Sequence, residues 1–120
     1  MTKPPISDNK ILYQAHLDNE IFDTTEHIKN NDTHWETYYR RGCAYRQKGN
    51  YGRAIADLNK ALKGNPRYAE AYYELAICYY KKKDYGRSWE NIHKATALEP
   101  ESDMPRKLIK LLKKASKRKR

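Results

Sequence analysis

The stretch WETYYRRGCAYRQKGNYGRAIADLNKALKGNPRY, residues 35–68, is followed directly by AEAYYELAICYYKKKDYGRSWENIHKATALEPES, residues 69–102, and the second stretch copies the plan of the first. Eleven of the 34 positions carry the same residue when the two stretches are aligned without a gap. Self-similarity at a fixed period of this length is the signature of a repeat architecture, in which one small structural unit is copied along the chain. The fold therefore follows from what a single unit encodes.

Each unit encodes two helices joined by a short turn. Tyr38, Gly42 and Tyr45 recur at spacings of three and four, which lines them along one face of a helix over residues 35–47. A Gly-Asn pair then breaks the pattern, and residues 51–63 carry the apolar stripe of a second helix, which the segment Gly64-Asn65-Pro66 stops. The second unit repeats this plan and ends at Pro100. The sequence therefore predicts two helical hairpins in tandem.

The spacing of small and aromatic residues in the two units resembles that of the tetratricopeptide repeat family, whose hairpins are also 34 residues long. Arg41 stands where the family usually has leucine, and Lys83 where it usually has glycine. The resemblance implies an all-α fold, a right-handed superhelical stack of antiparallel helix-turn-helix hairpins. The positions that carry the resemblance are, in pairs, Gly42 and Ala76, Tyr45 and Tyr79, Tyr51 and Tyr85, Ala54 and Ser88, Leu58 and Ile92, Ala61 and Ala95, and Pro66 and Pro100.

Four parts make up the expected organisation of the chain. Residues 1–34 are a flexible start followed by a degenerate hairpin or a capping helix, 35–68 and 69–102 are the two repeats, and 103–120 form a solvating helix with a basic tail. Asp103 is expected to cap this last helix, with Pro105 tolerated in its first turn. Its apolar residues are expected to face the last hairpin; these are Leu108, Ile109, Leu111, Leu112 and Ala115.

Composition favours one small domain that works inside the cell. The chain has 120 residues, no apolar run of membrane-spanning length and no apolar segment of a secretory signal near its start. Cys43 and Cys78 lie on the first helices of successive units, which suits reduced thiols better than a disulfide framework. We therefore expect a cytoplasmic protein.

Positive charge is concentrated at the C-terminus. The net charge is +10, of which residues 103–120 contribute nine basic and one acidic side chain, whereas residues 1–34 hold three basic and six acidic ones. The basic tail is either a solvated end that aids solubility or a site for a polyanion such as nucleic acid, or for an acidic protein. The residues of this alternative site are Lys113, Lys114, Lys117, Arg118, Lys119 and Arg120.

The family resemblance implies a concave groove lined by the first helix of each hairpin. Its expected partner-binding residues are Tyr39, Arg40, Cys43, Arg46, Tyr73, Glu74, Ile77, Tyr80 and Lys81. Their spacing points them away from the stripe that packs inside each hairpin. The tyrosines offer rigid amphipathic surface, and the basic side chains can hold a carboxylate of an extended segment. We refer to these nine residues as the groove face.

The sequence therefore predicts a protein-interaction module, a small scaffold or adaptor that binds a peptide or protein segment. No residue spacing predicts catalysis, a metal site or a cofactor. The clamp with which some family members hold the carboxylate tails of chaperones needs lysine, asparagine and arginine at places that hold Tyr39, Cys43 and Glu74 here, so chaperone-tail binding is not expected. Two alternatives remain open, namely polyanion binding through the basic tail and self-association as a homodimer through exposed repeat faces.

Overall fold

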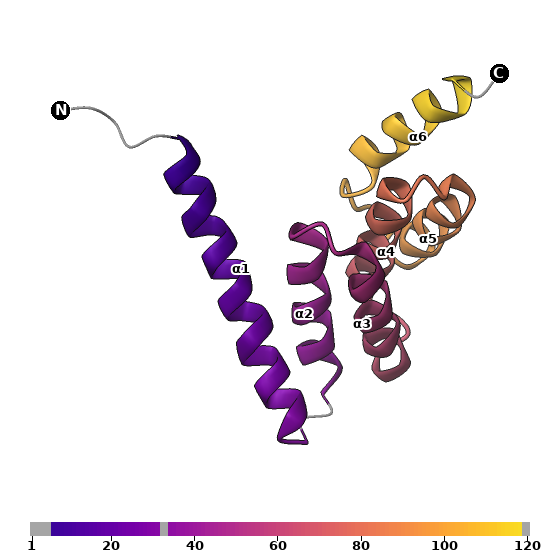
Figure 1. Cartoon of the computed structure of the whole chain (residues 1–120). Helices are drawn as coiled ribbons and strands as arrows, with labels where there is room; N and C mark the ends of the chain where they lie inside the picture. The colour runs from indigo at the N-terminus through magenta and orange to yellow at the C-terminus, as the bar shows by residue number, and fades with distance from the viewer. Residues whose placement is uncertain (1–5, 32–33, 119–120) are drawn as a thin grey trace.

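Helices make up nearly all of the structure, a computed structural model that describes residues 6–31 and 34–118 (Figure 1). Within these residues it has six helices and no strand, which confirms the predicted all-α stack of helical hairpins. The helices are α1 (Ile6–Lys29), α2 (Trp35–Gln47), α3 (Tyr51–Gly64), α4 (Ala69–Lys81), α5 (Tyr85–Leu98) and α6 (Arg106–Arg118). Helices α2 and α3 form one hairpin, α4 and α5 the next.

Both hairpins turn in the same way. Gly49 has a φ of +84°, and Lys83, which is 34 residues later, has a φ of +65° although it carries a side chain. The next residue, Asn50 or Asp84, caps the second helix, because its side chain accepts a hydrogen bond from a backbone N–H three residues on. The turn therefore keeps its geometry even where lysine has replaced glycine.

Small residues allow the two helices of each hairpin to approach closely. An added Cβ at Gly42 would lie 3.0 Å from the side chain of Leu58, so α2 and α3 meet at this point. In the second hairpin the buried hydroxyl of Ser88 donates a hydrogen bond of 2.7 Å to the carbonyl oxygen of Ala76. The serine that replaces the family's alanine thus has its polar group satisfied inside the hairpin.

Two apolar clusters hold the stack together. The first lies between the hairpins and consists of Ala54, Leu58, Ala71, Leu75 and Cys78. The second lies between the second hairpin and α6 and consists of Ala76, Ile92, Leu108 and Leu112. Each cluster joins only neighbouring elements, as expected of a repeat protein in which one unit buries the next.

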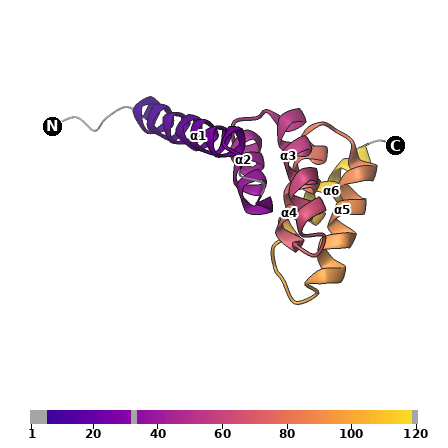
Figure 2. The same ribbon diagram turned by 90° about the horizontal axis from the view of Figure 1, so that it is seen from below.

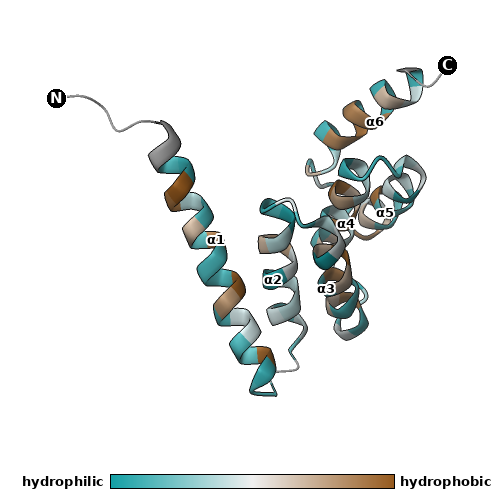
Figure 3. Cartoon of the chain, in the orientation of Figure 1, coloured by the Kyte–Doolittle hydropathy of each residue, from teal (hydrophilic) through white to brown (hydrophobic). Residues whose placement is uncertain are grey.

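The N-terminal segment is one helix, so the alternative of a degenerate hairpin is wrong for residues 6–31. Its second half packs on α2 and buries Leu17 and Thr24. Its first half diverges from the other helices in both views (Figures 1 and 2). Large apolar side chains remain exposed on this helix, among them Ile11, Leu12 and Phe22. Figure 3 shows hydrophobic segments alternating with hydrophilic ones along α1.

Sequence patterning missed the contacts of Arg41, which pairs with Asp57 inside the first hairpin and also bonds to α1. The guanidinium of Arg41 donates two hydrogen bonds to the carboxylate of Asp57 on α3, at 2.7 and 2.8 Å, and a third to the hydroxyl of Thr25 on α1, at 3.2 Å. Asp57 is only 4% exposed. Arginine at this position, in place of the family's leucine, therefore exchanges an apolar contact for a three-helix polar connection.

Two expectations for the last helix are wrong. The helix begins at Arg106 and not after Asp103, since the residue before a proline disfavours the helical conformation and Met104 precedes Pro105. Leu111 is 44% exposed and does not face the second hairpin, whereas Leu108 and Leu112 are buried against it as expected. Among the helices of the described residues, none has both the length and the apolar character needed to cross a bilayer.

Candidate functional site

Helix α6 continues the row of first helices that α2 and α4 begin. Two sets of buried residues recur every 34 positions, Thr37 with Ala71 and Pro105, and Ala44 with Cys78 and Leu112. Helix α6 therefore presents to the preceding hairpin a face similar to that of α4, although Leu108, which aligns with Glu74 of the groove face, is buried there. By the same register, Lys107, Leu111 and Lys114 take the places of Tyr73, Ile77 and Tyr80 on the groove face.

Tyr39 is half-buried between the two hairpins. Its ring meets the ring of Tyr68 edge to face, with 4.8 Å between the centroids, and it packs on the cluster that contains Leu58 and Leu75. Burial raises the pKa of the Tyr39 hydroxyl above its usual range, and the neighbouring Cys43 adds to this effect. Tyr39 therefore contributes to the packing between hairpins, and only part of its ring is available to a partner.

The arginine predicted to hold a partner's carboxylate already holds one from its own chain. Arg46 on α2 donates hydrogen bonds of 2.6 and 3.2 Å to the two carboxylate oxygens of Glu74 on α4. Burial lowers the pKa of Arg46 and is the largest single effect, but the hydrogen bonds to Glu74, the charge of Glu74 and smaller contributions from the two cysteines together raise it. The pair bridges the two hairpins in the middle of the groove face, where its charges cancel.

Arg40 is also paired within the chain. Its Nε donates a hydrogen bond of 2.8 Å to Glu20 on α1, so that this contact ties α1 to α2. Lys81, at the end of α4, is exposed and has no ion-pair partner within residues 6–31 and 34–118. Of the three cations predicted on the groove face, Lys81 is thus the one whose charge remains unpaired in the described part of the chain.

The aromatic and apolar residues of α4 lie beside α6. Tyr73, Ile77 and Tyr80 are half-buried and pack on the cluster that contains Leu108 and Leu112. Burial raises the pKa of Tyr73, in agreement with its partial cover. In the 34-residue register, these three residues are followed on α6 by Lys107, Leu111 and Lys114.

A shallow depression on α6 is lined by Lys107, Lys110, Leu111 and Lys114. We call these four residues the lysine strip. Sequence patterning missed the strip because Leu111 was assigned to the packed side of the helix. The 34-residue register contained the needed signal, since it aligns Leu111 with Cys43 and Ile77 of the groove face.

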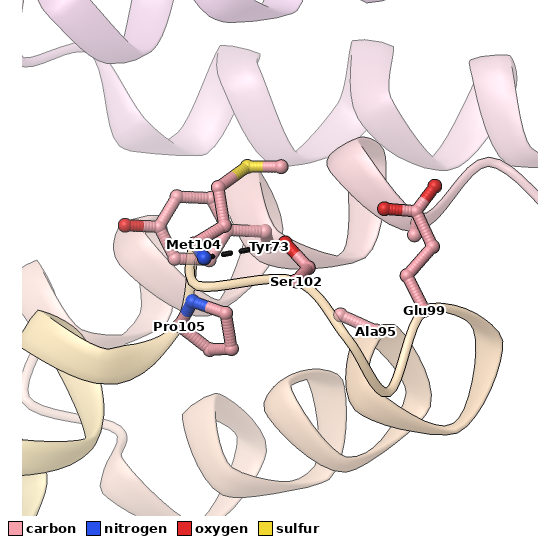
Figure 4. Close-up of a pocket in the computed structure, with 7 residues that line it drawn as sticks. Tyr73, Ala95, Glu99, Ser102, Met104 and Pro105 are labelled. Carbon is pink, nitrogen blue, oxygen red and sulfur yellow. Dashed lines mark hydrogen bonds between the residues drawn. The ribbon is translucent and has the colours of Figure 1, made fainter.

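A smaller hollow beside α4 offers no room for a ligand. Tyr73, Ala95 and Glu99 line it together with Ser102, Met104 and Pro105, whose backbone leads into α6, and the Met104 N–H donates to the Ser102 hydroxyl at 3.2 Å (Figure 4). The space inside holds about one water molecule. The hollow is therefore part of the packing between α6 and the second hairpin.

The two thiols are kept protonated by their surroundings. Burial raises the pKa of both Cys43 and Cys78 to about 12, and the charge of Glu74 adds to the shift. A thiol attacks as its thiolate, so neither cysteine is activated as a nucleophile at neutral pH. Residues 6–31 and 34–118 also contain no cluster of three His, Cys, Asp or Glu side chains that could hold a metal ion.

Four residues of the alternative polyanion site lie in the last part of α6. Lys114 belongs to the lysine strip, and the exposed Lys117, three residues later, lies on the same side of α6, whereas the exposed Lys113 lies outside the strip. Arg118 ends the helix, and Lys119 and Arg120 lie outside the described residues.

Comparison with known proteins finds tetratricopeptide repeat proteins, both by sequence and by structure. A model of the tetratricopeptide repeat matches residues 39–88. The first tetratricopeptide repeat domain of human RPAP3 is 20% identical, with a TM-score of 0.81, over 92% of this chain and 87% of that one. The first such domain of Spaghetti (RPAP3), bound to the HSP90 peptide SRMEEVD, is 20% identical, with a TM-score of 0.79, over 89% and 85%.

A third similar structure is the TPR2B domain of yeast Sti1 in its complex with pHsp70. It is 26% identical, with a TM-score of 0.73, over 92% of this chain and 90% of that one. No curated protein matches the chain. These solved structures share the helical-hairpin architecture over nearly the whole described length, including α1 and α6.

Proposed function

Because the chain belongs to the tetratricopeptide repeat family, we propose that it is a non-enzymatic interaction module that binds a segment of another protein on its groove face. Domains of this family are in general interaction modules without catalytic activity. Similar domains bound to an HSP90 peptide and to pHsp70 support peptide binding ahead of polyanion binding or self-association. The protonated thiols of Cys43 and Cys78 agree with the absence of a catalytic role, and two free thiols suit the cytoplasm.

The half-exposed side chains of α4 carry this proposal. Tyr73, Ile77 and Tyr80 are held in place by packing on α6, and each keeps an accessible part. Rigid aromatic and aliphatic side chains of this kind are the usual anchors of protein interfaces, since little conformational entropy is lost when they are covered. A segment lying across α4 would contact all three.

A chaperone tail is not the partner that we propose. The clamp positions hold Tyr39, Cys43 and Glu74, and Glu74 brings a negative charge to the place where the tail's carboxylate would lie. Its partner Arg46 only neutralises that charge, because both of its hydrogen bonds go to Glu74. Within the described residues, Lys81 is therefore the one unpaired cation of the groove face, whereas the clamp uses both a lysine and an arginine.

Selection of peptides from a displayed library of disordered segments, with the full chain immobilised, tests the proposal. We expect bound peptides whose affinity falls at least about tenfold in a Tyr73→Ala/Tyr80→Ala variant, the usual effect of removing central aromatic anchors. Tyr13→Ala is the matched control, because Tyr13 is 47% exposed on α1 and lies outside the groove face. Equal binding by all three proteins would contradict the proposal, and circular dichroism of each variant separates lost binding from lost folding.

A further inference from the structure

Unpaired positive charge is gathered at one end of the row of first helices. Lys107, Lys110 and Lys114 are exposed and have no ion-pair partner in the described parts of the chain. They lie at spacings of three and four along α6, so their ammonium groups project from one side of the helix. Lys81, at the end of α4, is a fourth unpaired cation on the neighbouring first helix.

At the other end of the row, at α2, the basic side chains are paired with carboxylates of the same chain. Arg46 is paired with Glu74 between α2 and α4, and Arg40 with Glu20 between α2 and α1. A carboxylate from a partner would have to displace an existing pair there, whereas at α6 it would meet an unpaired lysine. Acidic groups of a bound segment are therefore attracted to α6 and not to α2.

Leu111 decides which kind of acidic ligand fits. Its side chain is 44% exposed in the middle of the lysine strip and aligns with Ile77 and Cys43 in the 34-residue register. A nucleic-acid backbone would use the lysines and leave this leucine without a partner. A lipid surface would need a continuous apolar face, but Leu108 and Leu112 are already buried in the fold.

We propose that the partner segment is acidic and carries an apolar side chain, which packs on Leu111 while flanking carboxylates pair with Lys107, Lys110 and Lys114 of the lysine strip. This inference rests on the proposed function and adds the chemistry of the partner to it. The segment runs from the exposed parts of Tyr73, Ile77 and Tyr80 onto the outer side of α6. The apolar contact and the charge contacts together distinguish it from a simple polyanion.

The test compares four synthetic probes on the full-length chain. The first is a polyglutamate peptide with one central phenylalanine, the second has serine in place of phenylalanine, the third has glutamine in place of every glutamate, and the fourth is an oligothymidylate of equal charge. We expect the first probe to bind most tightly, measured by fluorescence anisotropy at low salt. Loss of the phenylalanine is expected to weaken binding about fivefold, in proportion to the apolar area that is no longer buried.

Three variants locate the site, and each changes an exposed residue of α6. Lys110→Glu is expected to weaken the first probe about tenfold, as is usual for charge reversal next to a bound carboxylate. Leu111→Ser is expected to weaken the first probe about fivefold and to leave the serine probe unchanged. Lys113→Glu is the matched control, since it makes the same charge change outside the lysine strip. It should weaken binding of the first probe much less than Lys110→Glu does.

Several results would overturn the inference. Oligothymidylate that binds as tightly as the first probe, with no response to Leu111→Ser, would make the strip a polyanion site. Equal effects of Lys110→Glu and Lys113→Glu would mean that the probe responds to the overall positive charge of α6 and not to pairing with the lysine strip. Library peptides that are lost in Tyr73→Ala/Tyr80→Ala but bind Lys110→Glu and Leu111→Ser normally would uphold the proposed function and refute the acidic segment.

Discussion

At the scale of single residues, Arg41 is a position where the sequence pattern does not predict the contact that the side chain makes. The family pattern predicts an apolar side chain at this position, and only the folded chain shows that Asp57, 16 residues away, is its partner. Hydrogen bonding to Asp57 raises the pKa of Arg41, so the pair stays ionised. Periodicity assigns residues to a face of a helix, but it does not identify which two polar groups will meet across a hairpin.

Removing one member of this pair should destabilise the fold more than removing both. Asp57→Ala leaves the guanidinium of Arg41 without its carboxylate, and we expect a loss of about 3 kcal/mol in the free energy of unfolding. An Arg41→Leu/Asp57→Leu double variant should recover most of that loss, because two apolar side chains of suitable size can pack where the pair was. Urea denaturation measures both values. A double variant as unstable as Asp57→Ala would show that the pair is not replaceable.

The two cysteines make stability depend on alkaline pH. Folding raises the pKa of Cys43 and Cys78 from 9.0 to about 12, so that above pH 9 the unfolded chain loses thiol protons that the folded chain keeps. The stabilisation from burying neutral thiols is complete below pH 9 and is lost as the pH rises toward 12.

We therefore expect the free energy of unfolding to fall between pH 8 and pH 10, a range in which the buried tyrosines begin to contribute only at the upper end. Urea denaturation at these two pH values measures the fall. A Cys43→Ala/Cys78→Ala variant should show a much smaller difference between the two. The same pH dependence with and without the thiols would assign the effect to other groups.

At the scale of the helices, the sequence predicted α2 to α5 within a residue because their signals are local. A glycine or lysine turn, an Asn or Asp cap and a terminal proline recur at fixed offsets, and each acts within its own unit. Helix α6 has no such repeat. The start of α6 was predicted too early. Leu111 was wrongly predicted to be packed, because five apolar residues lie close together on the helix and the sequence does not show which of them are buried.

Leu111 and Leu112 provide a direct test of this correction. Leu112 is fully buried between α6 and the second hairpin, and Leu112→Ala should lower the free energy of unfolding by about 3 kcal/mol through the cavity that it leaves. Leu111→Ala, the same change one residue earlier, should cost much less, about 0.5 kcal/mol, because Leu111 is 44% exposed and leaves no enclosed cavity. Thermal or urea unfolding compares the two. Similar losses would mean that both leucines are buried in solution.

At the scale of the whole molecule, the chain is extended for its length. Its radius of gyration is 16.2 Å, whereas a compact domain of this size has about 14 Å. The candidate site reflects this shape, since it is built from one face each of α2, α4 and α6 and has no enclosed cavity. The sequence could predict which residues lie on α2 and α4. It could not predict that Arg40 and Arg46 pair with Glu20 and Glu74, because those contacts depend on how separate helices are placed.

Helix α1 packs on α2 only through its second half, so the amides of its two halves should exchange with solvent at different rates. From Leu17 onward it buries Leu17 and Thr24 and is tied to α2 by Glu20 and Thr25, whereas each of residues 9–13 is exposed. Amides of residues 6–16 should exchange through local fraying at almost no free-energy cost, and those of residues 20–29 only when contacts with α2 open. Mass spectrometry of peptic fragments measures both rates, and uniform protection would contradict the division. One continuous helix of 24 residues then contains two units of different local stability.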